Sequence, residues 1–378
     1  MINHVLRGRR ALLAGFATVV AAVGLSTGIA HATDVAHATS PQASPHTWHV
    51  LVGAQGAHRA VQTMGFYPTH LWVDQGDTVT WVANSAEIHT VTFLATAPCD
   101  TGELCAPPQG FNPGDPLQST PQGGTSYDGS SYYNSGVLTS ATGDTGPLPP
   151  FVHVQRTYSL TFPDTLAPGT YNYLCLVHGM TMTGTVVVQA AGTPYPFRQW
   201  QYDRYDHHRI RADIRDGLAL WRKARHDARR QSSWHHRVVL SGVMDDRAMV
   251  MRFIPAWPEI RVGDQVTFVA TSMGEPHTVT FGSDETGCGA PPCNPEAPWN
   301  VALDASGNET ADYPGQNGGW TGDTHALNSG LMLGLPPAAT GVPSQLTVRF
   351  TQPGSFRYVC ALHDYMGMVG RVQVHRDR

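Results

Sequence analysis

Two short segments of the sequence each bring a thiol, an imidazole and thioethers into one loop, and each has a further histidine far upstream. Two imidazoles and a thiolate, with a weak axial thioether, are the ligand set of a type 1 copper site. Sulfur favours Cu(I) and nitrogen supports Cu(II), so such a set suits one-electron chemistry. The residues concerned are Cys175 and His178 with upstream His89, and Cys360 and His363 with upstream His277.

These segments close two copies of one longer unit. Residues 64–83 align with residues 251–270 without a gap and share the patterns Met-x-Phe-x-Pro and Gly-Asp-x-Val-Thr. Each copy then reaches His-Thr-Val-Thr-Phe, later Asn-Ser-Gly and Pro-Gly, and finally its cysteine. Self-similarity of this length and order indicates a duplication that covers most of the chain after its first segment.

The elements that must position these residues are short strands. Runs such as Thr78-Val-Thr-Trp-Val are rich in β-branched and aromatic residues and end at Gly-Asp or Asn-Ser turns, which predicts an all-β sandwich in each copy. The stretches 95–150 and 282–340, rich in Gly, Ser, Pro and Asp, are expected to be large surface excursions.

The connector between the copies differs in kind. From Pro196 to His236 it holds ten Lys and Arg residues against five Asp. Apolar residues at steps of four, four and three, from Ile210 to Trp221, predict an amphipathic helix over roughly 204–230. This helix is either a spacer packed against one domain or a docking surface for an acidic partner or membrane surface.

In all these motifs the sequence resembles the cupredoxin family of blue copper proteins, of the plastocyanin/pseudoazurin type, present as two tandem copies. The resemblance implies two Greek-key β-sandwich domains, each holding one copper ion, with the downstream histidine near the surface as the electron port. Carried over to this chain, the ligands are His89, Cys175, His178 and Met182 in the first copy, and His277, Cys360, His363 and Met368 in the second.

The axial methionine has two candidates in each loop. Met182 and Met368 align just before the closing strand, so we expect these to be the ligands. Met366 also fits the shorter spacing of amicyanin-like loops, whereas Met180 follows His178 too closely to reach round easily. Both choices stay open at this point.

The other four cysteines fall in pairs inside the two excursions. In an exported protein, close pairs of this kind favour local disulfides. That would leave the two loop cysteines unpaired, as thiolate ligands must be; a disulfide between Cys175 and Cys360 is the alternative. The expected disulfide cysteines are Cys99 with Cys105, and Cys288 with Cys293.

The first 32 residues are expected to be a signal peptide. Arg7, Arg9 and Arg10 precede an apolar run that ends in an Ala-x-Ala cleavage site at Ala30 to Ala32, and the arginine pair also suits a twin-arginine signal. An uncleaved anchor is the alternative. We expect a signal peptide at 1–32, a flexible segment at 33–45, cupredoxin domains at 46–192 and 236–378, and a basic helical linker at 193–235.

Composition bounds the possible functions. The chain has 378 residues, 41% of them hydrophobic and 14% charged, with a formal net charge of −5, which argues against general nucleic-acid binding and against a long coiled coil. We expect a non-enzymatic carrier that exchanges electrons with other exported redox proteins. Copper storage or delivery is an alternative. A two-domain copper enzyme is less expected, because no histidine flanks Cys175 or Cys360.

Overall fold

The structure is a computed structural model. It describes residues 44–96, 103–108, 110–142, 148, 151–282, 298–315 and 326–376. The expected signal peptide at 1–32 lies outside these residues, as does most of the expected flexible segment at 33–45.

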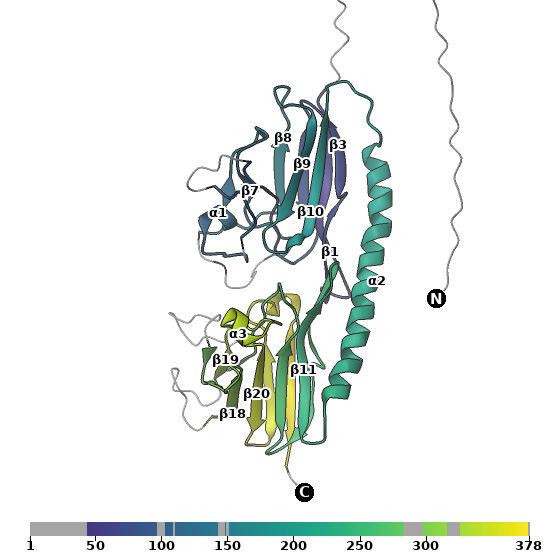
Figure 1. Ribbon diagram of the computed structural model, residues 1–378. Coiled ribbons are helices and arrows are strands. Elements are labelled where there is room, and N and C mark those ends of the chain that lie inside the picture. The colour runs from purple at the N-terminus through teal and green to yellow at the C-terminus, as the bar shows by residue number, and fades with distance from the viewer. Residues whose placement is uncertain are drawn as a thin grey trace, which may run out of the picture. The chain divides into compact units, whose positions relative to one another are not determined.

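Strands dominate the described chain, as the all-β prediction required, and helices are few (Figure 1). The elements before the connector are β1 (Thr47–Gly56), β2 (Val61–Tyr67), β3 (His70–Asp74), β4 (Thr78–Ala83), β5 (Thr92–Phe93), α1 (Pro116–Ser119), β6 (Pro121–Gln122), β7 (Tyr133–Ser135), β8 (Thr157–Thr161), β9 (Gly169–Cys175) and β10 (Gly179–Gln189). The connector holds α2 (Gln199–Gln231). The elements after it are β11 (His236–Met244), β12 (Ala248–Ile254), β13 (Glu259–Arg261), β14 (Gln265–Ala270), β15 (Thr280–Phe281), β16 (Pro298–Trp299), β17 (Ala302–Leu303), β18 (Glu309–Tyr313), β19 (Leu327–Ser329), α3 (Pro337–Thr340), β20 (Gln345–Phe350), β21 (Gly354–Val359), the 3₁₀ helix η2 (Asp364–Met366) and β22 (Val369–His375).

Each copy is a sandwich of two sheets, and the two copies share one of them. The shared sheet has the order β17-β18-β20-β14-β11-β12-β2-β1-β4-β8, and it passes from one copy to the other where β12 pairs antiparallel with β2. The second sheet of the first copy is β3-β10-β9-β5-β7-β6, and that of the second copy is β13-β22-β21-β15-β19-β16.

Alternation of buried and half-buried residues explains why these segments form strands. In β4, Val79, Trp81 and Ala83 are buried while the residues between them are partly exposed. The inward residues of the two sheets meet in an aromatic core, where Trp81 packs edge-on against Tyr173 and Phe268 packs against Tyr358 in the same way. The duplicated sequence therefore builds the same core twice.

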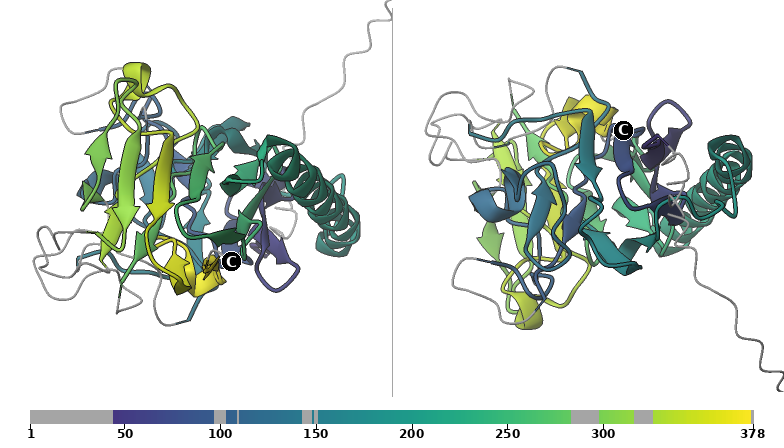
Figure 2. Two further views of the ribbon diagram at one scale, coloured as in Figure 1. Left: turned by 90° about the horizontal axis from the view of Figure 1, so that it is seen from below. Right: turned by 90° about the horizontal axis from the view of Figure 1, so that it is seen from above.

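Helix α2 confirms the predicted helix and extends it by a turn at its start. It contacts β1, β2, β11 and β12 of the shared sheet, and Figures 1 and 2 show it running along these strands. The fully buried face is not the predicted apolar row, whose members are half-buried. It holds small and polar residues instead, namely Tyr202, Asp206, Asp213, Gly217, Ala224 and Ala228. Within the described residues, no helix is long and apolar enough to cross a membrane.

The expectation of purely surface excursions was wrong for the described parts of both stretches. In the first, β7 joins the sheet beside β5, and Leu138 is fully buried. In the second, β18 and β19 pair with β20 and β15. These strands are short and lie in Gly- and Pro-rich sequence, so they carry no long apolar run that would predict them. Pairing with neighbouring strands places their side chains in the core.

Candidate metal centres

Backbone pairing to the excursions holds the upstream histidines in place. His89 forms a two-way bridge with Leu138, with N–H···O distances of 2.9 and 2.8 Å, and His277 forms the same bridge with Met332 at 3.1 and 2.8 Å. The repeated Asn-Ser-Gly motif completes the support, because Ser135 Oγ accepts the Val91 N–H and Ser329 Oγ accepts the Val279 N–H. The excursions are thus part of the machinery that places the sites.

The cysteine and second histidine of each site come from one strand end. Cys175 is the last residue of β9, and His178 lies in the turn to β10. Cys360 directly follows β21, and His363 precedes η2. A tight turn after a paired strand leaves little freedom, so the loop presents both side chains to the upstream histidine.

In the first copy, His89, Cys175 and His178 come together. The Cys175 sulfur lies 3.9 Å from His89 Nδ1 and 3.4 Å from His178 Nδ1. With metal–sulfur and metal–nitrogen bonds of about 2.3 and 2.0 Å at a trigonal angle, a ligand sulfur and nitrogen should lie about 3.7 Å apart. These residues therefore fit a single metal ion.

In the second copy, His277, Cys360 and His363 form the same arrangement. The Cys360 sulfur lies 3.8 Å from His277 Nδ1 and 3.4 Å from His363 Nδ1, and the two Nδ1 atoms lie 3.1 Å apart. Both loop cysteines are free and buried, so they do not form the alternative disulfide with each other. A buried thiol between two imidazoles fits a copper ion by the chemistry of its donors.

Backbone donors and neighbouring groups complete each site. The Thr90 N–H donates to Cys175 Sγ, and the Thr278 N–H donates to Cys360 Sγ, both at 3.3 Å. In the first copy, His89 Nε2 lies 2.8 Å from Ser85 Oγ, which orients the ring with Nδ1 toward the sulfur.

Glycines with positive φ make room for the upstream rings. Gly53 (φ 65°) and Gly242 (φ 70°) sit where the register of β1 with β2, and of β11 with β12, shifts. A Cβ added to Gly53 would lie 2.5 Å from His89 Nε2, and one added to Gly242 would lie 2.1 Å from His277 Nε2. Glycine is required here by both the backbone and the close approach.

Titration in the metal-free chain follows from burial. Burial, together with the neighbouring histidine, lowers the pKa of His89 and of His277 well below the ordinary value, so these rings are neutral and carry a free lone pair. Burial also raises the pKa of the Cys175 thiol to about 11. Cys175 would give up that proton on binding a metal ion, because the thiolate is the ligand.

The predicted axial methionines lie in the cores of their own copies. Met182 is 1% exposed and packs in the cluster that contains Cys175, whereas Met180 is 71% exposed. Met368 packs in the cluster that contains Cys360, and Met366 packs instead in the core of the first copy. These placements favour Met182 and Met368, whose ligation stays a prediction.

The expected disulfides fall largely outside the description. Cys99, Cys288 and Cys293 are not among the described residues. Cys105 is described and is disulfide-bonded. The two pairings themselves stay predictions.

Two features of the site differ from expectation or were missed. The downstream histidines do not form surface ports, because His363 is buried and His178 half-buried, and both face the other copy through a pocket that residues of both copies line. Glu87 and Glu275, which the sequence analysis did not single out, line the same pocket. Glu275 Oε1 is 2.8 Å from His363 Nε2. A repeated Glu-x-His at each upstream histidine was the signal that could have found them.

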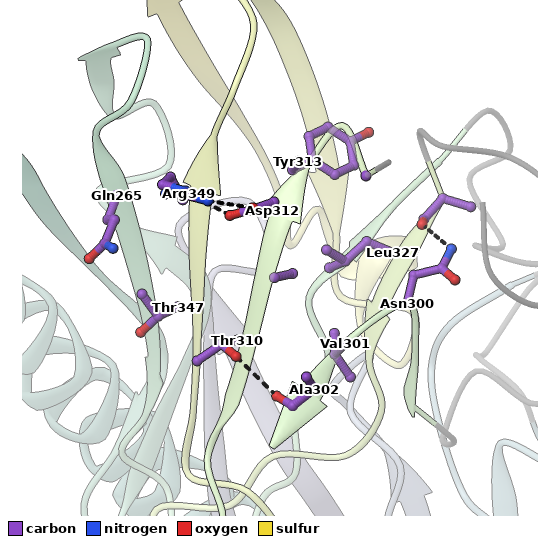
Figure 3. Close-up of a pocket in the computed structure, with 13 residues that line it drawn as sticks. Gln265, Asn300, Val301, Ala302, Thr310, Asp312, Tyr313, Leu327, Thr347 and Arg349 are labelled. Carbon is purple, nitrogen blue, oxygen red and sulfur yellow. Dashed lines mark hydrogen bonds and ion pairs between the residues drawn. The ribbon is translucent and has the colours of Figure 1, made fainter. Parts of the chain in front are cut away.

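A separate pocket of about 660 Å³ lies in the second copy, among β14, β18 and β20 (Figure 3). Arg349 Nε donates to Asp312 Oδ1 at 2.8 Å, so these two charges satisfy each other. None of the predicted ligands lines this pocket.

No protein-family model and no curated protein sequence matches the chain. Similar solved structures include a Cu(I) amicyanin variant, 17% identical with a TM-score of 0.21, covering 39% of this chain and 90% of that one. A mutant plastocyanin of a fern is 19% identical with a TM-score of 0.21, covering 37% and 99%. A reduced amicyanin variant at pH 4 is 23% identical with a TM-score of 0.21, covering 38% and 82%.

Proposed function

We propose that this protein is an exported, copper-binding electron-transfer protein with two type 1 sites. The observation that supports it most is the pair of buried groups in which one free cysteine lies against two histidine Nδ1 atoms. Copper held there supplies one-electron cycling between Cu(II) and Cu(I). The proposed ligands are His89, Cys175, His178 and Met182, and His277, Cys360, His363 and Met368.

The contribution of the chain is to hold these donors still. Each sulfur is fixed by a backbone N–H, each upstream ring is enclosed by a glycine bulge, and each loop is clamped between paired strands. A rigid donor set changes little between oxidation states, which favours fast electron exchange over chemistry on a substrate. The aliphatic neighbours of both cysteines agree with a carrier rather than an enzyme.

The remaining parts of the proposal concern organisation and partners. We propose that residues 46–192 and 236–378 are the two cupredoxin domains and that 1–32 directs export. The partners would be other exported redox proteins that give and take electrons. The exposed basic residues of α2 offer a docking surface for an acidic partner, because charge complementarity speeds association.

The test is a copper assay with visible spectroscopy on the purified protein. The oxidised protein should bind two copper ions and show intense sulfur-to-copper absorption. Cys175→Ser and Cys360→Ser should each remove about half of that absorption, and each variant acts as the control for the other site. Intense absorption that survives in the double variant, or Cu(II) bound without it in the wild type, would refute the proposal.

A further inference from the structure

Two buried glutamates meet between the copies. Glu87 and Glu275 each stand two residues before an upstream histidine, and the two residues are 1% and 5% exposed. They belong to different copies, yet both line one pocket of about 600 Å³ together with His178 and His363. The glutamates of the two Glu-x-His elements, one from each copy, therefore face the same pocket.

The downstream histidines turn their outer nitrogens toward these carboxylates. In each ring, Nδ1 faces the cysteine of its own copy. His363 Nε2 donates to Glu275 Oε1 at 2.8 Å. One ligand atom each from Glu87, His178 and Glu275 lies within 4.8 Å of the others.

Three polar atoms at this point are buried without a hydrogen-bond partner among the described residues: Glu87 Oε2, Glu275 Oε2 and His178 Nε2. A buried polar atom left without a partner is costly, and two adjacent carboxylates repel each other as well. A cation would satisfy all three atoms and neutralise the repulsion.

We propose that Glu87, Glu275 and His178 Nε2 form a third metal site, between the two copies, for a divalent transition-metal ion of the Zn²⁺ class. Two carboxylates and one imidazole nitrogen suit such an ion, whereas Ca²⁺ and Mg²⁺ prefer sites built from oxygen alone. Binding displaces the Nε2 proton of His178 to solvent through the adjoining pocket, so that this ring bridges two metals. The inference rests on the proposed function only in assigning His178 Nδ1 to copper.

Cobalt(II) can test this site separately from the thiolate sites. Co²⁺ bound to cysteine gives sulfur-to-cobalt charge-transfer absorption, whereas Co²⁺ bound by carboxylate and imidazole does not. Titration of the metal-free full chain should show two equivalents with that absorption and one tight equivalent without it. Glu87→Gln should weaken the third equivalent at least tenfold and leave the first two intact.

Glu309→Gln is the matched control, because Glu309 is also a buried carboxylate whose oxygens have no hydrogen-bond partner among the described residues, and it lines neither site. It should retain all three equivalents. The two thiolate-bound equivalents report that each variant is folded. A third equivalent that is missing from the wild type, or that survives Glu87→Gln because Co²⁺ sits on exposed histidines, overturns the inference. Loss of the sulfur absorption from the wild type would instead refute the proposed copper sites.

Discussion

Each upstream histidine ring fills space beside a glycine in the neighbouring strand. Gly242→Ala would drive a methyl group into His277 and also force a non-glycine residue to positive φ. We expect this variant to lose metal binding at the second copy while the first copy keeps it, halving the thiolate-to-metal absorption. The measurement is a copper titration followed by visible absorption.

Gly263→Ala separates the two effects. Gly263 also has a positive φ (89°), but apart from its chain neighbours no atom of the described residues lies within 4 Å of an added Cβ. This control should lower stability by about 1 kcal/mol through backbone strain and keep both metal ions. Equal loss of metal in the two variants would show that crowding of His277 is not the cause.

Glu309 should make the free energy of unfolding depend on pH, and substitution of this one residue can measure its contribution. Burial raises its pKa from an ordinary 4.5 to about 8. Between these values the unfolded chain loses the proton and the folded chain keeps it, so stability falls as pH rises, by roughly 1.4 kcal/mol per pH unit at most. Glu309→Gln should remove this dependence.

Urea unfolding of the metal-free protein at pH 5 and pH 8 measures the effect. The gain in unfolding free energy from Glu309→Gln should be larger at pH 8 than at pH 5. Asp246→Asn, at an exposed position, is the control and should give no such difference. A gain that is the same at both pH values would contradict the assignment.

At the scale of elements, α2 packs closely on the shared sheet because Gly217, at the contact, has no side chain. A Cβ on Gly217 would lie 2.4 Å from Val61 Cγ1 and 3.1 Å from Ala248 Cβ. Tyr67 on β2 donates to Asp213 one turn earlier at 2.7 Å. The helix therefore sits too near the sheet to accept even a methyl group.

Gly217→Ala should destabilise the protein by about 1 kcal/mol, because overpacking of about 1–3 kcal/mol exceeds a helix-propensity gain of about 1 kcal/mol. Arg215→Ala, an exposed position on the same helix, should change stability by less than about 0.5 kcal/mol. Chemical denaturation compares them. A more stable Gly217→Ala would show that the helix can move away freely.

Local residue patterns in the sequence predicted the strands and the connector helix. Alignment of the chain with itself predicted the repeat. Neither predicted which face of α2 is buried, because Gly217 and Asp213 carry no apolar signal. The strands inside the excursions were missed because β7 and β19 are only three residues long and form by pairing with neighbouring strands.

The candidate metal ligands could be proposed from the motifs that resemble those of cupredoxins, because each set belongs to one copy. The meeting of Glu87 with Glu275 could not, since it depends on how two copies pack together. No local pattern specifies that packing, even though the Glu-x-His repeat was visible.

Over the whole molecule, the two copies are joined by more than the connector. Arg252 donates to Met366 O within the second copy and to His58 O of the first, at 2.8 and 2.9 Å. Tyr365 O–H donates to Ala86 O, and Met249 and Met251 of β12 pack in the core of the first copy. Apolar burial and hydrogen bonds thus cross between the copies.

Calorimetry of the metal-free protein should therefore show one unfolding transition. Arg252→Ala should lower its midpoint, at a cost of about 1–3 kcal/mol, because the carbonyl groups of the buried residues Met251 and Met366 lose a donor. Arg371→Ala, at an exposed position in β22, is the comparison. Two well-separated transitions in the wild type would mean that the copies unfold independently.

Pairing of β2 with β12 also bears on what happens if the chain is cut. In a lone first copy, β2 would become the outermost strand of its sheet, and in a lone second copy β12 would. Both strands are mainly buried and apolar, and an unprotected outer strand of this kind is a template for self-association. Separated halves would associate with each other or self-associate through these strands. In the intact chain, pairing of β2 with β12 protects both strand edges from water.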